Sequence, residues 1–174
     1  MKAFKHFMTI TKHRHAVIRH GLKSGIFFQS LFHDLSKYSP IEFISGVKYY
    51  KGTRSPNETE RELFGYSKAW LHHKGRNKHH FEYWLDYSPI TKKTEPVKMP
   101  IKYVKEMFCD RVAASKIYLG KNYTQHHPIE YFERGRANRV IHKHTSELLE
   151  LWLRTLDEKG ESEAFKLIKN TTVY

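Results

Sequence analysis

The stretch LFHDLSKYSPIE, residues 31–42, combines an apolar helix end with the start of another helix. Leu31 and Phe32 belong to an apolar segment that then presents an imidazole, a carboxylate and the ammonium group of Lys37. Burying such groups without a partner or ligand is costly, so their grouping indicates a functional site. Residues 39–42 then supply a serine cap, a proline at the first helical position and a glutamate that closes a capping box. The stretch therefore predicts a helical fold with polar chemistry at a helix end.

Helix-start signals of the same kind continue outward from this stretch. Residues 55–58 (SPNE) repeat the serine, proline and glutamate pattern. We expect helices near residues 11–21, 24–37, 40–50, 56–74, 78–86, 100–119, 128–158 and 161–169. The longest of them should break near Gly135, and residues 88–98 are typical of an irregular surface loop. Because no segment shows sustained β alternation, the expected fold class is all-α, a compact multi-helix bundle.

A chain of 174 residues suits one compact domain with a real core. We therefore expect a single helical domain over residues 1–174, in which the helices of residues 128–174 pack on the preceding part. Purely apolar runs, such as residues 26–28, are far shorter than the roughly 20 residues that cross a bilayer. Lys5 and His6 interrupt the N-terminal stretch before a secretory apolar region forms. We expect no membrane partner and a cytoplasmic location.

The net charge of +13 favours partners that carry phosphate: a nucleotide, another phosphorylated small molecule or a nucleic acid. A solvated basic surface is the alternative, because lysine and arginine are scattered along the whole chain. The only cysteine, Cys109, excludes an internal disulfide and a cysteine-rich zinc module. A bound metal ion would therefore have to be held by histidines and carboxylates.

The chain contains 13 histidines, and the positions of a few of them are informative. His13 shares a helix face with Val17, whereas His15 lies on a different face and is the alternative to His13. His33 and Asp34 are neighbours in a predicted helix, where adjacent side chains project about 100° apart. One helix could thereby offer a nitrogen and an oxygen to the same cation.

Further candidates lie on the later predicted helices. In helix 56–74, His73 continues an apolar stripe and is expected to face inward. That stripe consists of Leu63, Tyr66, Trp70 and His73. Either His79 or His80 should face back toward His73, and His80 is favoured because it shares a helix face with Trp84.

Asp110 is the only charged residue of an apolar stripe on predicted helix 100–119. The stripe consists of Tyr103, Met107, Asp110 and Ala114. A carboxylate in such a stripe needs a cation, a network of hydrogen-bond donors, or exposure. With His33 and Asp34 it could hold a metal ion, or form a buried salt-bridge network with Lys37.

Several short segments together resemble the HD-domain superfamily of metal-dependent phosphohydrolases. The pattern of that superfamily is a histidine, a His-Asp pair and a distant aspartate on bundled helices. His13 with Val17 resembles its first His-x-x-x-Val helix, residues 33–37 (HDLSK) resemble its His-Asp-x-Gly-Lys signature, and residues 109–113 (CDRVA) resemble its terminal Ala-Asp-Lys/Arg stretch. The resemblance covers roughly residues 9–116 and implies an HD-like helical bundle with a metal site between its helices.

The resemblance implies one or two bound divalent cations. The residues that match the family's ligands are His13, His33, Asp34 and Asp110 for one cation, and His73 and His80 for a second, with His79 as an alternate to His80. Such nitrogen and oxygen ligands suit Fe, Mn, Co, Ni or Zn. The charge of two divalent cations would outweigh that of two aspartates, so the pocket would be net positive.

The sequence departs from the superfamily pattern at Ser36, which replaces the usual glycine. The interval from His13 to His33 is short, and the gap from His73 to His80 is much shorter than in typical binuclear members. The whole chain is also similar to a family of small bacterial and phage proteins whose activity is not established. The resemblance therefore implies a class of reaction and leaves the substrate open.

The reaction that the resemblance implies is hydrolysis of a phosphate ester, in particular in a nucleotide, by metal-activated water. Asp34 and Lys37 are the expected catalytic residues, because Lys37 lies beside the metal site and would steady a substrate oxyanion. One alternative is an HD-type di-iron oxygenase, which needs iron at both positions. The other is a basic nucleic-acid-binding protein with a structural metal, whose binding would be sensitive to salt.

Overall fold

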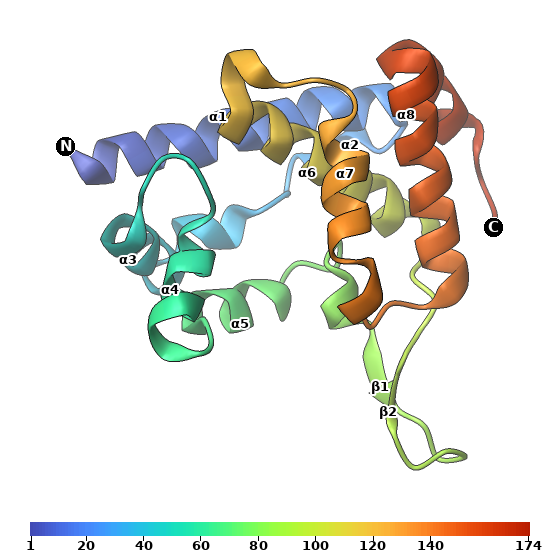
Figure 1. Cartoon of the computed structure of the whole chain (residues 1–174), viewed down its shortest axis with the longest axis horizontal. Coiled ribbons are helices and arrows are strands. Elements are labelled where there is room, and N and C mark those ends of the chain that lie inside the picture. The colour runs from blue at the N-terminus through green and yellow to red at the C-terminus, as the bar shows by residue number, and fades with distance from the viewer.

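The computed structural model describes residues 1–174 and is mostly helical (Figure 1). Its α-helices are α1 (Lys2–Lys23), α2 (Phe27–Ser30), α3 (Pro40–Tyr49), α4 (Pro56–Phe64), α5 (Lys68–Lys74), α6 (Ile101–Leu119), α7 (His127–Arg134) and α8 (Lys143–Asn170). Short 3-10 helices are η1 (Leu35–Tyr38), η2 (Phe81–Tyr83), η3 (Gly120–Asn122) and η4 (Arg136–Asn138). The strands β1 (Leu85–Tyr87) and β2 (Thr94–Pro96) form one antiparallel hairpin. The expected helical fold class is confirmed.

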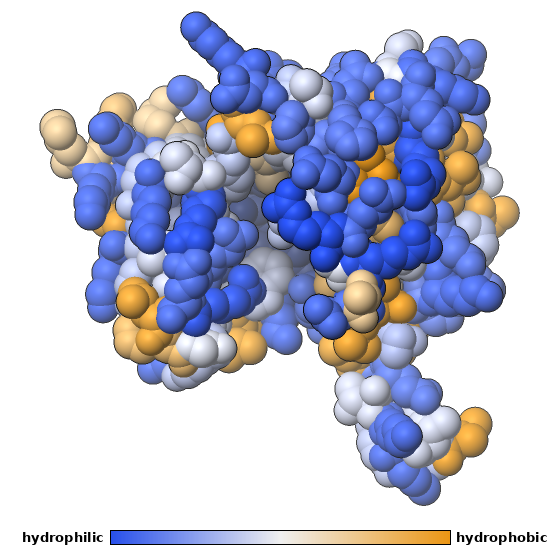
Figure 2. All heavy atoms as spheres, viewed as in Figure 1, coloured by the Kyte–Doolittle hydropathy of each residue, from blue (hydrophilic) through white to orange (hydrophobic).

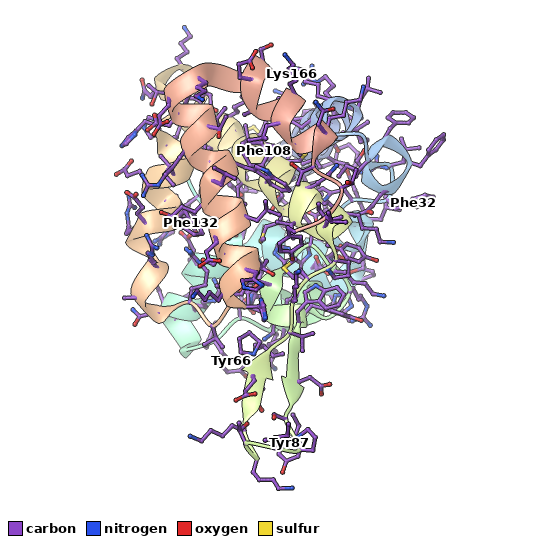
Figure 3. All side chains as sticks on the ribbon, turned by 90° about the vertical axis from the view of Figure 1, so that its right-hand side faces the viewer. Phe32, Tyr66, Tyr87, Phe108, Phe132 and Lys166 are labelled. Carbon is purple, nitrogen blue, oxygen red and sulfur yellow. The ribbon has the colours of Figure 1, made fainter.

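The apolar core lies where α6 packs against α1, α7 and α8. Phe108 of α6 is fully buried and meets Trp152 and Phe165 of α8 edge-on, with ring centroids 6.3 and 5.7 Å apart. Figure 3 shows Phe108 and Phe132 enclosed by helices, whereas Phe32 lies at the edge of the molecule. The apolar face of α8 therefore packs on the core formed by the earlier helices.

A second group of helices, α3, α4 and α5, packs on the other end of α1 and on η1. The space-filling view shows a hollow between the surface over α4 and α5 and the surface over α7 (Figure 2). The residues at the hollow's edge toward α7 are among the most hydrophilic in this view. None of the helices combines the length and the apolar character that a membrane span requires.

The expected helix over residues 24–37 is wrong. The only α-helix there is α2, and the chain then turns before the 3-10 helix η1. Asp34 takes the left-handed conformation, with φ 54° and ψ 24°, which no α-helix of L-residues continues through. His33 and Asp34 therefore project from a turn, not from a helix.

Other expected boundaries shift for local reasons. The predicted helix 56–74 is divided at Gly65, whose φ of 78° ends α4. Leu63 and Tyr66 are consequently exposed and do not share a stripe with His73. Residues 78–86 form η2 and β1 instead of a helix, and part of the expected loop 88–98 pairs as β2 in a hairpin that extends away from the body (Figures 1 and 3).

The ends of the remaining helices also differ from expectation. The first helix starts at Lys2, well before the expected residue 11. The break expected near Gly135 is present, and residues 135–142 separate α7 from α8. The expected helix 161–169 is the continuation of α8 beyond a kink at Gly160, where φ is 84° and ψ is 172°.

Candidate metal centre

Asp34 is the centre of a buried cluster of histidines and carboxylates. Its side chain is only 2% exposed, although aspartate side chains are almost never fully buried unless they are paired. The cluster draws on α1, the turn before η1, α5, the segment after α5, and α6; its members are His13, His33, Asp34, His73, His79, His80 and Asp110. Elements far apart in the sequence therefore meet at one carboxylate.

The two oxygens of Asp34 face different histidines. Oδ2 lies 3.2 Å from His33 Nε2 and 3.7 Å from His13 Nε2. Oδ1 lies 3.3 Å from His73 Nε2 and 3.5 Å from His79 Nε2. One carboxylate thus lies between two sets of imidazoles, which is the arrangement of a carboxylate that bridges two cations.

The first set consists of His13, His33, Asp34 and Asp110, whose ligand atoms all lie within 4.8 Å of one another. Asp110 Oδ1 is 3.0 Å from His13 Nε2 and 3.6 Å from His33 Nε2. The two Nε2 atoms are only 3.4 Å apart. Two buried imidazole nitrogens that converge with two carboxylates suit a shared divalent cation.

The second set consists of Asp34, His73, His79 and His80, again with ligand atoms within 4.8 Å of one another. The Nε2 atoms of His79 and His80 are buried and have no hydrogen-bond partner in the chain. Buried polar atoms are rarely left in this state, because the missing bond costs free energy. A cation at this position would satisfy both nitrogens, so the residues present fit a second metal ion.

Two glutamates orient the histidines from behind. Glu106 Oε1 accepts hydrogen bonds from His33 Nδ1 at 2.8 Å and from His79 Nδ1 at 3.1 Å. Glu42 Oε2 accepts one from His73 Nδ1 at 2.8 Å. A proton on Nδ1 leaves the lone pair on Nε2, which is the atom that faces Asp34. Glu106, His33 and His79 are also close enough to one another to hold an ion. Their contacts have hydrogen-bond lengths and involve Nδ1, so we interpret this group as support for the histidines and not as a third metal site.

The electrostatics of the cluster follow from this concentration of carboxylates. Burial opposes ionisation of Glu106, but hydrogen bonds from His33 and His79 outweigh it and lower its pKa to about 2. Burial would also lower the pKa of His33, yet Asp34, Asp110 and Glu106 together raise it well above its usual value. The carboxylates therefore favour positive charge at their centre.

The charge balance includes two carboxylates that the sequence-based expectation of a net positive pocket did not count. Glu42 and Glu106 join Asp34 and Asp110, so four carboxylates would balance two divalent cations. The surplus positive charge then belongs to Lys37, whose Nζ lies 2.6 Å from Asp34 Oδ2. Its side chain is 29% exposed, so Lys37 lies between the buried cluster and solvent.

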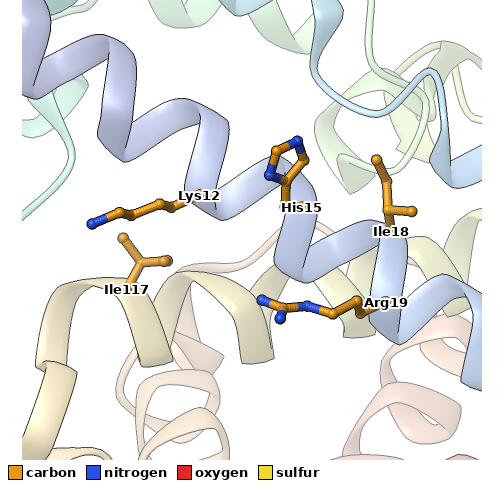
Figure 4. A pocket seen from close by; sticks show the side chains of 5 residues that line it. All are labelled: Lys12, His15, Ile18, Arg19 and Ile117. Carbon is orange, nitrogen blue, oxygen red and sulfur yellow. The ribbon is translucent and has the colours of Figure 1, made fainter.

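The structure brings together the predicted residues His13, His33, Asp34, Lys37, His73, His80 and Asp110, and it adds His79, which was expected only as an alternate. His15 is not part of the cluster. It is exposed and lines a shallow pocket with Lys12, Ile18, Arg19 and Ile117 on the outer face of α1 (Figure 4). His79 and His80 both converge because the chain between α5 and η2 is a turn and not the expected helix, on which adjacent side chains would diverge.

Sequence reasoning missed Glu42 and Glu106. Glu42 was explained by the capping box, but Ser39 makes no side-chain capping bond and Glu42 pairs with His72 and His73 instead. The position of Glu106 could have been predicted from the sequence, because Glu106 precedes Asp110 by four residues and so shares its helix face.

The residue that departs from the superfamily pattern, Ser36, has a place in this network. Its Oγ accepts a hydrogen bond from Asn77 Nδ2 at 2.8 Å and lies 3.2 Å from His73 Nδ1. The serine therefore connects η1 to the end of α5, a contact that glycine would lack.

Comparison with known proteins gives a family but no activity. The chain matches the family described as "Family of unknown function (DUF5662)" over residues 2–155. No curated protein and no solved structure matches. The matched region contains every residue of the buried cluster.

Proposed function

The chain belongs to this family of unknown function, so its activity has to be inferred from the buried cluster, and we propose that it is a metal-dependent phosphohydrolase with two divalent cations. The observation that carries the proposal is the position of Asp34, whose two oxygens face two separate sets of imidazoles. A buried carboxylate with this surrounding is expected to bridge two cations. The resemblance to the HD-domain superfamily supports the same reaction class.

The chain's own residues define which ions fit. His13, His33 and Asp110 would hold one cation with Asp34, and His73, His79 and His80 would hold the other. Ligands that are all nitrogen or oxygen suit Fe, Mn, Co, Ni or Zn. When bound, two such cations supply an activated water and polarise a phosphoryl oxygen.

Asp110 and Lys37 form the more exposed side of the cluster. His33, Asp34 and His73 are at most 2% exposed, whereas the side chains of Asp110 and Lys37 are 17% and 29% exposed. A phosphate ester would therefore approach from the side of Asp110 and Lys37. The ammonium group of Lys37 is placed to bind a phosphoryl oxygen and to steady the charge that develops on it.

The direct test is metal content and hydrolysis in wild type and Asp34→Asn, both purified without a metal-binding tag. We expect close to two transition-metal equivalents in wild type, loss of metal in Asp34→Asn, and hydrolysis of phosphate monoesters or nucleotides by wild type alone. Asp86→Asn, on the exposed hairpin, is the matched control and should behave like wild type. Wild type that stays free of metal after reconstitution would overturn the proposal.

The same variants separate the alternatives. Oxygen consumption that requires iron at both positions, without phosphate release, would assign the cluster to a di-iron oxygenase. Salt-sensitive binding of nucleic acid that is unchanged in Asp34→Asn, again without phosphate release, would assign the chain to nucleic-acid binding.

A further inference from the structure

Arg111 and Arg139 lack the counter-ions that other arginines nearby possess. Arg111 Nε and Arg139 Nη1 are buried without a hydrogen-bond partner, and neither side chain forms an ion pair. The arginines on α7, η4 and α8 are paired: Arg134 with Glu130 at 3.0 Å, Arg136 with Glu150 at 3.1 Å and Arg154 with Glu133 at 2.7 Å. An unpaired guanidinium with a buried donor leaves a hydrogen bond unmade.

The guanidinium of Arg139 is held in a preformed position. It lies 4.4 Å from the ring centroid of Phe132 and 5.9 Å from that of Phe81, and its Nη2 donates to the Phe132 carbonyl oxygen at 2.9 Å. A Cβ at Gly135 would come within 2.7 Å of Nη2. Because the φ of Gly135 is −94°, its backbone does not require glycine, and the missing side chain serves to leave room for this guanidinium.

The positive charges of Arg111 and Arg139 favour a bound anion between them. Burial, together with the positive charge of Arg111, lowers the pKa of Arg139 to about 10. Glu82 acts in the opposite direction, but its Oε2 is itself buried without a partner and forms no ion pair with either arginine. Two guanidinium groups that repel each other are stabilised by a shared anion, and phosphate suits their planar arrays of donors.

Each arginine is linked to the metal centre through one neighbouring residue. Arg111 directly follows Asp110 on α6, and Phe81, against which Arg139 lies, directly follows His80. The hollow between the surface over α4 and α5 and the surface over α7 has its most hydrophilic edge toward α7, the helix that carries Phe132 (Figure 2). An anion at the arginines and a phosphate at the metal centre would therefore belong to neighbouring positions.

We propose that Arg111 and Arg139 form a phosphate-binding site beside the metal centre. Binding of an anion at this site does not require that the chain hydrolyse a substrate. The substrate class that follows rests on the proposed function: the hydrolysed ester carries a second phosphate group, as nucleoside diphosphates and bisphosphates do. One phosphate group lies at the metal centre and the other at the arginine pair.

The test is calorimetric binding of inorganic pyrophosphate to the metal-free full chain. Arg139→Gln removes charge-assisted hydrogen bonds to the anion, so it should weaken binding roughly tenfold or more. Arg134→Gln, which removes the same charge from an exposed pair on α7, is the matched control and should keep wild-type affinity within about twofold at constant salt. Gly135→Ala keeps every charge but displaces the guanidinium, and it should also weaken binding.

The outcomes separate this site from the proposed function. Pyrophosphate binding that persists in Asp34→Asn but not in Arg139→Gln supports the arginine site, even if no hydrolysis is found. Equal affinity in Arg139→Gln, Gly135→Ala and Arg134→Gln, or no binding by wild type, overturns it even if the metal centre is active. Circular dichroism and thermal melting of each variant show whether a loss of binding comes from a loss of fold. In active protein, Arg139→Gln should raise KM for substrates with two phosphate groups more than it raises KM for monophosphates.

Discussion

At the scale of single residues, the glutamates behind the histidines decide how well the cluster can hold a metal ion. Glu106 accepts from His33 and His79 at the same oxygen and is 7% exposed as a side chain. It thus keeps both imidazoles in one tautomer and in one orientation.

Replacing this carboxylate should weaken metal binding without unfolding the chain. In Glu106→Gln the amide keeps the volume but loses the charge that favours the Nδ1 proton, so we expect metal affinity to fall by about 10- to 100-fold. A competition titration with a chelator measures this, and Glu158→Gln, at an exposed position on α8, is the control. Equal affinity in both variants would show that Glu106 does not support the ligands.

Cys109 offers a second test at this scale. The thiol is fully buried on α6 beside Asp110, and burial raises its pKa to about 12. Since the thiolate forms only when pH approaches this raised pKa, the thiol stays protonated and unreactive at pH 8. An aromatic disulfide reagent should label the native chain slowly and the unfolded chain quickly; fast labelling of the native chain would contradict the described packing of α6.

At the scale of elements, the places where helices stop position the ligands. The left-handed Asp34 ends the segment after α2 and lets both His33 and Asp34 face inward. Gly65 separates α4 from α5, which frees α5 to bring His73 toward Asp34.

Replacing Gly65 should destabilise the fold through its backbone conformation alone. Its φ is 78° and no atom lies within 4 Å of the position of an added Cβ, so Gly65→Ala adds backbone strain but no clash. We expect a loss of about 1–2 kcal/mol in the free energy of unfolding. Gly75→Ala, at φ −72°, is the matched control and should change stability much less. Denaturant titration compares them, and equal losses would contradict the assigned backbone conformation.

The sequence-based prediction succeeded where residue type alone carries the signal. Proline at the first turn located the starts of α3 and α4, and the histidines and aspartates of the cluster were identified by their chemistry and by the family pattern. It failed where tertiary contacts override local preference. Residues 24–37 have the apolar content of a helix, yet Asp34 adopts a left-handed turn, and Glu42 leaves its expected capping role for two histidines.

At the scale of the whole molecule, the candidate metal centre lies between the helices around α5 and the main apolar core. Its residues come from α1, α5, α6 and the turns between elements, while the main apolar core lies on the α6, α7 and α8 side. Cations bound there would cross-link the helices around α5 to that core.

Removal of metal should therefore lower thermal stability. A ligand at 100 times its Kd stabilises the folded state by about 2.7 kcal/mol, which corresponds to roughly 5–10 °C in Tm for a chain of this size. We expect a chelator to lower the Tm of metal-loaded wild type by this amount and to leave the Tm of Asp34→Asn unchanged. A chelator that lowers both equally, or neither, would show that the cluster does not link metal binding to folding.

Anomalous diffraction from crystals of the metal-loaded chain would locate the cations that we propose at Asp34. We expect two anomalous peaks, one beside Oδ2 among His13, His33 and Asp110, and one beside Oδ1 among His73, His79 and His80. A single peak would reduce the centre to one cation. The absence of any peak at Asp34, with the histidines instead bonded to one another through protons and water, would show that the cluster is not a metal centre.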